Sequence, residues 1–91
     1  MDKRVRAVYD GWVQGVGFRF SAERAANSLG LKGWVKNLPD GRVEIVCEGA
    51  EEAIKEFLTK MGSIFKTYIR NADIEWGKAD GGFEDFDIRF E

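Results

Sequence analysis

The spacing of the apolar residues changes twice along this chain, from every second residue to every third or fourth and back. Val5, Ala7 and Tyr9 alternate with charged neighbours, which is typical of a strand with one buried face. From Phe18 onward the apolar positions recur at spacings of three and four, which is typical of an amphipathic helix. Strands are therefore expected at 5–11, 32–38, 42–48, 72–76 and 86–90, and helices at 18–29 and 51–61.

The order of these elements predicts the fold. Gly30 and Gly62 are expected to end the two helices, because glycine accepts the positive φ of a helix C-terminal cap. Strand, helix, strand, strand, helix, strand and a short terminal strand make an α+β, ferredoxin-like two-layer sandwich. We expect an antiparallel sheet with both helices on one face.

This topology has a consequence for residues that are far apart in the sequence. A helical crossover makes the first two strands parallel, so they end at the same edge of the sheet. The loop over 11–17 is therefore expected near Asn37, at the end of the second strand. With the third strand between them, the separation is two strand spacings, roughly 10 Å.

Length and composition exclude several classes of protein. Ninety-one residues fit one domain over 1–91, and the chain has no histidine and one cysteine, Cys47. A disulfide framework, an ordinary zinc site, a His-based triad and a phosphohistidine are thereby excluded. No apolar run approaches a membrane span, and the charged start is not followed by the apolar stretch of a signal peptide. A cytoplasmic protein without membrane contact is expected, with Cys47 in its core.

Charges are unevenly distributed along the chain. Residues 1–42 contain eight Lys/Arg and four Asp/Glu, whereas residues 43–91 contain six and twelve. An anionic ligand would prefer the first half, although solvated helix and strand faces explain the same distribution. Charged residues form 33% of the chain against the usual ~25%, which points toward a thermophilic source.

A glycine-bearing loop, GWVQGVGFR over 11–19, leads directly into the first predicted helix. Backbone N–H groups at such a junction converge on anions, and the helix dipole favours negative charge. Gly15 and Gly17 permit a tight turn, and Arg19 presents two N–H donors to phosphate oxygens. The pattern is neither a Walker loop nor a dinucleotide fingerprint. By itself, a glycine before a helix is more often a plain turn than a phosphate site.

Two segments together indicate a family. VQGVGFR at 13–19 and GWVKNLPDGRVE at 33–44 resemble the motifs of the acylphosphatases, which are small ferredoxin-like hydrolases of carboxyl phosphates. The resemblance covers nearly the whole chain. It implies that Arg19 binds the substrate phosphate, that Asn37 orients the attacking water, and that backbone amides share the phosphate: those of Gly15, Val16, Gly17, Phe18 and Arg19. Two departures are Trp12, at a position often polar or basic, and 62–65, which lacks the Gly-Pro link of many relatives.

The residues themselves suit such chemistry. Neither motif contains an obvious general acid, which an alkoxide leaving group would need. A carboxylate, whose conjugate acid has a pKa of about 4, leaves unaided. Positioning and charge stabilisation then suffice for phosphoryl transfer. No carboxylate cluster for magnesium accompanies the motifs, so no metal and no cofactor is expected. Inorganic phosphate is expected as product and inhibitor.

Other interpretations remain open at this stage. Asn37 before a proline turn could satisfy turn backbone, and Trp12 could form a wall of the substrate site. An RNA recognition motif shares the fold, but the third strand has no aromatic residue and two acids, so no nucleic-acid partner is expected. A catalytically idle acylphosphatase-like domain that binds an acyl phosphate or carbamoyl phosphate for a larger assembly is a further alternative. Otherwise a monomer that acts on small acyl phosphates is expected.

Overall fold

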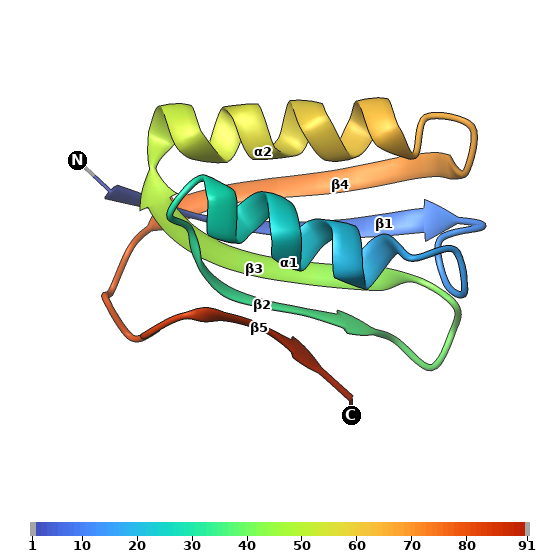
Figure 1. The fold of residues 1–91 in the computed structure, drawn as a ribbon, viewed down its shortest axis with the longest axis horizontal. Coiled ribbons are helices and arrows are strands. Elements are labelled where there is room, and N and C mark those ends of the chain that lie inside the picture. Colours follow the sequence, from blue (N-terminus) through green and yellow to red (C-terminus); the bar gives the residue numbers. More distant parts are fainter. Residues whose placement is uncertain (1, 91) are drawn as a thin grey trace.

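The computed structural model describes residues 2–90 and arranges them in two layers, a five-stranded sheet and two helices that cover one of its faces (Figure 1). This arrangement confirms the predicted ferredoxin-like sandwich. The elements, in chain order, are β1 (Asp2–Gly11), α1 (Phe18–Ser28), β2 (Lys32–Asn37), β3 (Val43–Ala50), α2 (Glu51–Ile64), β4 (Ile69–Lys78) and β5 (Phe86–Arg89). None of the described helices is long and apolar enough to span a membrane.

The sheet has the strand order β4-β1-β3-β2-β5, so β3 lies between β1 and β2 as predicted. Three of the pairings are antiparallel, but β2 and β5 are parallel, and the prediction of a wholly antiparallel sheet is wrong. The reason is the connection from β4 to β5. It passes along one end of the sheet from one edge to the other and reverses the chain once, so β5 takes the direction of β2 (Figure 1).

A buried carboxylate holds the connection between β4 and β5. Glu48 in β3 is 6% exposed and accepts hydrogen bonds from the backbone N–H groups of Asp80 and Gly81, each at 3.0 Å. Arg4 lies 3.5 Å from Glu48 and 3.1 Å from the Asp80 carboxylate. The buried charge is thus hydrogen-bonded and paired, and it holds the first part of the connection to β5 against β3.

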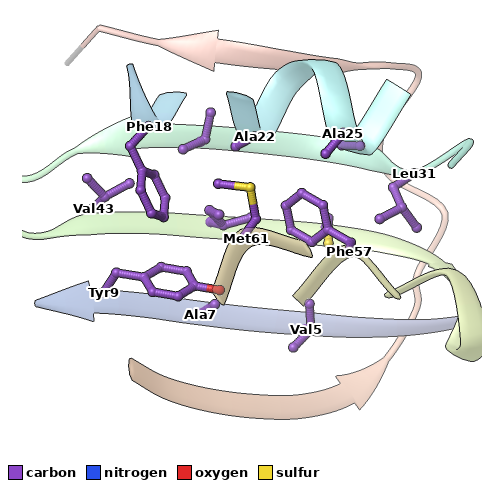
Figure 2. Packing of buried hydrophobic residues seen from close by; sticks show 14 of the residues in the cluster. Val5, Ala7, Tyr9, Phe18, Ala22, Ala25, Leu31, Val43, Phe57 and Met61 are labelled. Atoms are coloured by element: carbon purple, nitrogen blue, oxygen red, sulfur yellow. The ribbon is translucent and has the colours of Figure 1, made fainter. Parts of the chain in front are cut away.

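The core lies between the sheet and the two helices (Figure 2). Phe18, Phe57 and Met61 project from the helices toward Tyr9 and other residues of the central strands, and all are at most 2% exposed. The rings of Tyr9 and Phe18 are 5.0 Å apart and tilted, which is a favourable aromatic geometry. Desolvation raises the pKa of Tyr9 to about 12, so its hydroxyl stays neutral. Phe18 therefore anchors the start of α1, next to the glycine loop.

Cys47 is fully buried in this core, as predicted. Burial, with a smaller contribution from the charge of Glu48, raises the pKa of the Cys47 thiol to about 12. A protonated, inaccessible thiol is a poor nucleophile, so Cys47 serves the core as a small apolar residue.

The ends of the two helices differ in how well the sequence predicted them. Gly30 has φ of 70° just after α1, which confirms its role as a capping glycine. Gly62, however, lies inside α2, which continues to Ile64, so its predicted role as a helix end is wrong. Two contacts of Phe65, the residue just beyond the helix, explain the extension. Its side chain is buried in the core, and its backbone N–H donates to the Met61 carbonyl.

Gly33 in β2 gives a stability prediction. Its φ is 149°, and a Cβ there would overlap the Val46 carbonyl oxygen and lie 2.7 Å from the Cα of Cys47. Gly33→Ala is expected to destabilise the fold by about 3 kcal/mol and to lower the melting temperature by at least about 10 °C. Thermal unfolding followed by circular dichroism measures this.

The matched control is Gly62→Ala. Nothing lies within 4 Å of its added Cβ, and Gly62 is not among the glycines with positive φ. Alanine is the better helix former, so this variant should gain about 0.5–1 kcal/mol. Equal stability of the two variants would contradict the steric argument for Gly33.

Candidate active site

The glycine loop connects β1 to α1 and leaves the start of the helix open. Gly15 and Gly17 have φ of 77° and 81°, as their predicted turn requires. Gly17 is the N-cap residue and has no side-chain capping bond, and the first turn of α1 contains no acidic residue. The Ser21 amide makes the first helical bond, to the Gly17 carbonyl. Amides earlier in that turn are directed toward an outside acceptor, where the helix dipole favours an anion.

Arg19 stands in the first turn of α1, and its charge is available. Among residues 2–90, no carboxylate and no hydrogen-bond acceptor partners its guanidinium, whose neighbour is the ring of Phe90, 5.1 Å from Cζ. Four other arginines differ in this respect, because each forms an ion pair with a carboxylate: Arg4, Arg6, Arg42 and Arg70. The donors of Arg19 therefore remain free for a ligand.

Asn37 is the last residue of β2, and its side-chain oxygen is unusual. The Oδ1 atom is buried without a hydrogen-bond partner, and within residues 2–90 no other buried side-chain nitrogen or oxygen shares that condition. A buried acceptor without a donor is unfavourable by about 1–3 kcal/mol. Such an atom marks a place where a water or ligand hydrogen belongs.

The topology brings these two residues together as the sequence indicated. One cavity of about 230 Å³ is lined by Val13, Gly15, Gly17, Phe18, Arg19, Phe20 and Asn37. Arg19 and Asn37 thus line the same cavity, although Arg19 lies at the start of α1 and Asn37 at the far end of β2, the strand that follows α1. Val16 is not among the lining residues, and its half-buried side chain packs against the core. The role predicted for its backbone amide stays a prediction.

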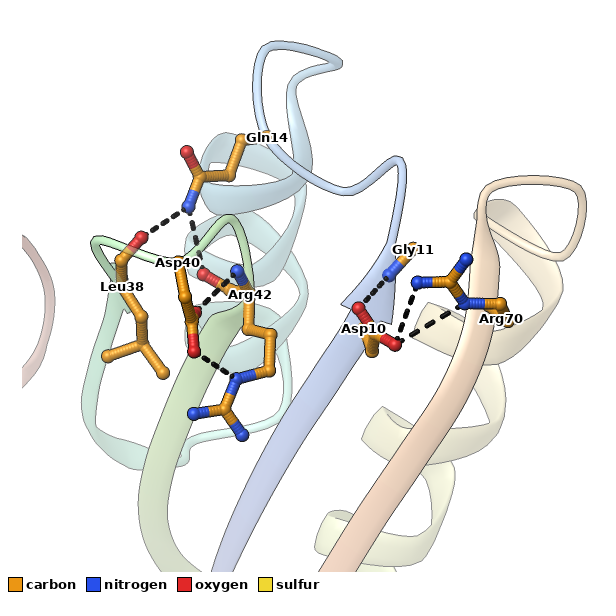
Figure 3. A network of polar contacts seen from close by, with 7 residues as sticks. All are labelled: Asp10, Gly11, Gln14, Leu38, Asp40, Arg42 and Arg70. Atoms are coloured by element: carbon orange, nitrogen blue, oxygen red, sulfur yellow. Dashed lines mark hydrogen bonds and ion pairs between the residues drawn. The ribbon is translucent and has the colours of Figure 1, made fainter.

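Sequence reasoning missed one residue that fixes this arrangement, Gln14. Its side-chain amide spans from the loop to the turn after β2, where Nε2 donates to the carbonyl oxygens of Leu38 at 2.8 Å and Arg42 at 2.9 Å (Figure 3). These two bonds hold the loop against the turn that follows Asn37. A sequence signal existed, because a lone amide within a glycine loop is conspicuous in a chain with a single glutamine.

A larger depression of about 650 Å³ lies beside the loop and includes Trp12, Tyr68 and Arg70 in its lining. Its cation is already neutralised, since Arg70 donates to the Asp10 carboxylate at 3.0 Å (Figure 3). Trp12 lines this depression and not the cavity of Arg19 and Asn37. The smaller cavity holds a cation and a buried acceptor that have no polar partner within residues 2–90, and it is therefore the better candidate for chemistry.

Comparison with known proteins identifies the family and supports the whole fold. The family model described as Acylphosphatase matches residues 5–88. An acylphosphatase of Thermus thermophilus is 44% identical over 86% of this chain and 90% of its own. One of Caldanaerobacter subterraneus is 42% identical over 97% of this chain and 99% of its own. The crystal structure of acylphosphatase from Bacillus subtilis superposes with a TM-score of 0.87 and 34% identity over 96% of this chain and 98% of that one. This chain belongs to the acylphosphatase family of enzymes.

Proposed function

We propose that this chain hydrolyses the carboxyl–phosphate bond of acyl phosphates without a metal ion, with Arg19 and the loop amides on the phosphate and Asn37 on the attacking water. One observation carries the proposal. Arg19, whose guanidinium has no carboxylate partner among residues 2–90, and Asn37, whose Oδ1 has no donor there, line the same cavity. A phosphate with a water beside it would satisfy both.

The phosphate is bound by fixed charge and fixed dipoles. Arg19 directs a planar fork of N–H donors at two phosphate oxygens, and the amides of 15–19 with the α1 dipole contribute further donors. These donors are in place before the reaction, so the transition state gains their full effect without reorganisation. The free charge on Arg19 is what distinguishes this loop from an ordinary turn.

Asn37 orients the attacking water by accepting a hydrogen bond from it. Asn37 Oδ1 is an acceptor without a donor, and a water O–H directed at it turns an oxygen lone pair toward the phosphorus. The neutral amide does not take the proton, which passes to the substrate or to bulk solvent. Asn37 therefore acts by position and not as a base.

The reaction needs little more from the protein. The water oxygen forms a bond to phosphorus, the bond from phosphorus to the acyl oxygen breaks, and the carboxylate leaves with the electron pair. Because that carboxylate is a weak base, no general acid is required. Inorganic phosphate is the second product, and it competes with substrate for Arg19 and the loop.

Further expectations belong to the same proposal. Residues 1–91 act as one domain and as a monomer in the cytoplasm, with no nucleic-acid partner and no cofactor. Turnover distinguishes this proposal from a domain that only binds an acyl phosphate.

The test combines chelation with a choice of leaving group. Phosphate release from benzoyl phosphate is expected to persist after exhaustive dialysis against EDTA, because the chain has no histidine and neither motif supplies a cluster of hard oxygen ligands. Phenyl phosphate and alkyl phosphates should be hydrolysed at least about a hundredfold more slowly, since general acid catalysis is worth roughly 10²–10⁴ and none is present. Activity that is lost on chelation and restored by magnesium, or comparable rates on esters, would refute the proposal.

A further inference from the structure

Two exposed phenylalanines stand next to Arg19. The chain has seven phenylalanines, and the most exposed are Phe20 at 65% and Phe90 at 77%. Phe20 follows Arg19 in α1 and lines the cavity that Arg19 and Asn37 share. Phe90 places its ring 5.1 Å from Arg19 Cζ. Clustered exposed aromatic side chains mark binding surfaces more often than scattered ones do.

The two rings come from separate parts of the fold, Phe20 to the cavity that Arg19 lines and Phe90 to the Arg19 guanidinium. Phe20 is carried by α1, whereas Phe90 follows β5, which pairs with β2 in parallel register from Gly33↔Phe86 to Lys36↔Arg89. The connection before β5 is fixed by Glu48, as described above. Both positions are therefore set by the scaffold and not by the glycine loop.

Neither ring is needed for the phosphate, which has no apolar surface. The other half of an acyl phosphate is its acyl group, which must extend out of a cavity whose interior is occupied by the phosphate and water. We propose that Phe20 and Phe90, here called the aromatic rim, contact the acyl group and select acyl phosphates with aromatic or other large apolar acyl groups over small ones. This inference rests on the proposed function.

The rim acts on binding more than on chemistry. Contact between a ring and an acyl group is present in the substrate complex and in the transition state alike. Uniform binding of that kind lowers KM and leaves kcat nearly unchanged. Inorganic phosphate lacks an acyl group, so its affinity is independent of the rim.

The experiment compares benzoyl phosphate with acetyl phosphate. Phe20→Ala and Phe90→Ala are each expected to lower kcat/KM for benzoyl phosphate about threefold to tenfold through KM, with acetyl phosphate changed less than twofold. The inhibition constant of inorganic phosphate should stay within twofold of wild type. Both side chains are exposed, so circular dichroism should find the variants folded, and leucine at each position should keep part of the effect.

The matched controls remove apolar side chains elsewhere. Ile64→Ala takes away a residue 53% exposed at the end of α2, and Phe83→Ala takes away a ring stacked 5.3 Å from the Cζ of Arg4. Both should leave the ratio of the two substrates unchanged.

Two results would refute the role proposed for the aromatic rim and leave the proposed function intact. One is an unchanged substrate ratio in an enzyme whose hydrolysis depends on Arg19. The other is an equal loss on both substrates together with weaker phosphate inhibition, which would make Phe90 a positioning residue for Arg19. A wild-type chain that releases phosphate from neither substrate would instead refute the proposed function, and the rim with it.

Discussion

Arg19→Ala is expected to lower kcat/KM for benzoyl phosphate at least about a thousandfold and to abolish inhibition by inorganic phosphate at millimolar concentration. The guanidinium is the cation of the cavity and has no carboxylate partner among residues 2–90, so its donors are free for phosphate. Each charge-assisted hydrogen bond is worth about 1.5–3 kcal/mol, and a fork makes two. Steady-state kinetics with phosphate as competitive inhibitor measures both effects.

Two further variants separate the role of the fork from that of charge. Arg19→Lys keeps the charge but not the planar fork, so it should recover only part of the phosphate affinity. Arg24→Ala removes an exposed arginine from the same helix and should leave kinetics unchanged. If phosphate inhibited Arg19→Ala at wild-type concentrations, Arg19 would not be the phosphate ligand.

Asn37→Ala is expected to lower kcat about a hundredfold or more while phosphate inhibition stays within a few-fold of wild type. The Asn37 amide holds the water, whereas Arg19 and the loop hold the phosphate. The Asn37 variant should therefore lose turnover and keep its affinity for phosphate. An interaction made chiefly in the transition state reduces kcat and kcat/KM equally. Positioning of a nucleophile is worth several kcal/mol, which sets the size of the effect.

The stability of the same variant completes this test. Removal of Asn37 takes away a buried acceptor that has no partner within the described chain, 2–90, so the melting temperature should not fall by more than a few degrees. Asn71→Ala, at an exposed position of β4, is the control for loss of an asparagine amide. A folded Asn37→Ala that binds phosphate and turns over at the wild-type rate would exclude the water-orienting role.

The sequence was sufficient for the two layers, for the place of β3 between β1 and β2, and for the meeting of Arg19 with Asn37, because these follow from local periodicity and the topology of the crossover. It was not sufficient for β5. The direction of a short edge strand depends on how the preceding connection crosses the sheet, and here that depends on a contact from Glu48 to Asp80 and Gly81. The position of Phe90 beside Arg19 follows from β5 and was missed for the same reason.

The roles of the side chains in the glycine loop could also not be predicted from the spacing of apolar residues. Gln14 reaches carbonyl groups of Leu38 and Arg42, and such long-range partners leave no periodic trace in a sequence. The exposed position of Trp12 on a neighbouring depression depends on the local path of the loop. Gly62 shows the converse, since the burial of Phe65 overrides the tendency of glycine to end a helix.

The position of β3 between β1 and β2 determines when the cavity exists during folding. Arg19 follows β1 and Asn37 ends β2, and within the sheet β3 lies between these strands and pairs with β1 from Asp2↔Ala50 to Tyr9↔Val43. Pairings so distant along the chain form late, because loop-closure entropy must be overcome before they contribute. Because α1 also packs on β2 and Gln14 bonds the loop to the turn after Asn37, the site opens when these contacts and the sheet are lost together. Loss of activity on heating should therefore coincide with cooperative unfolding of the whole sheet, and recovery of activity should be among the last events of refolding.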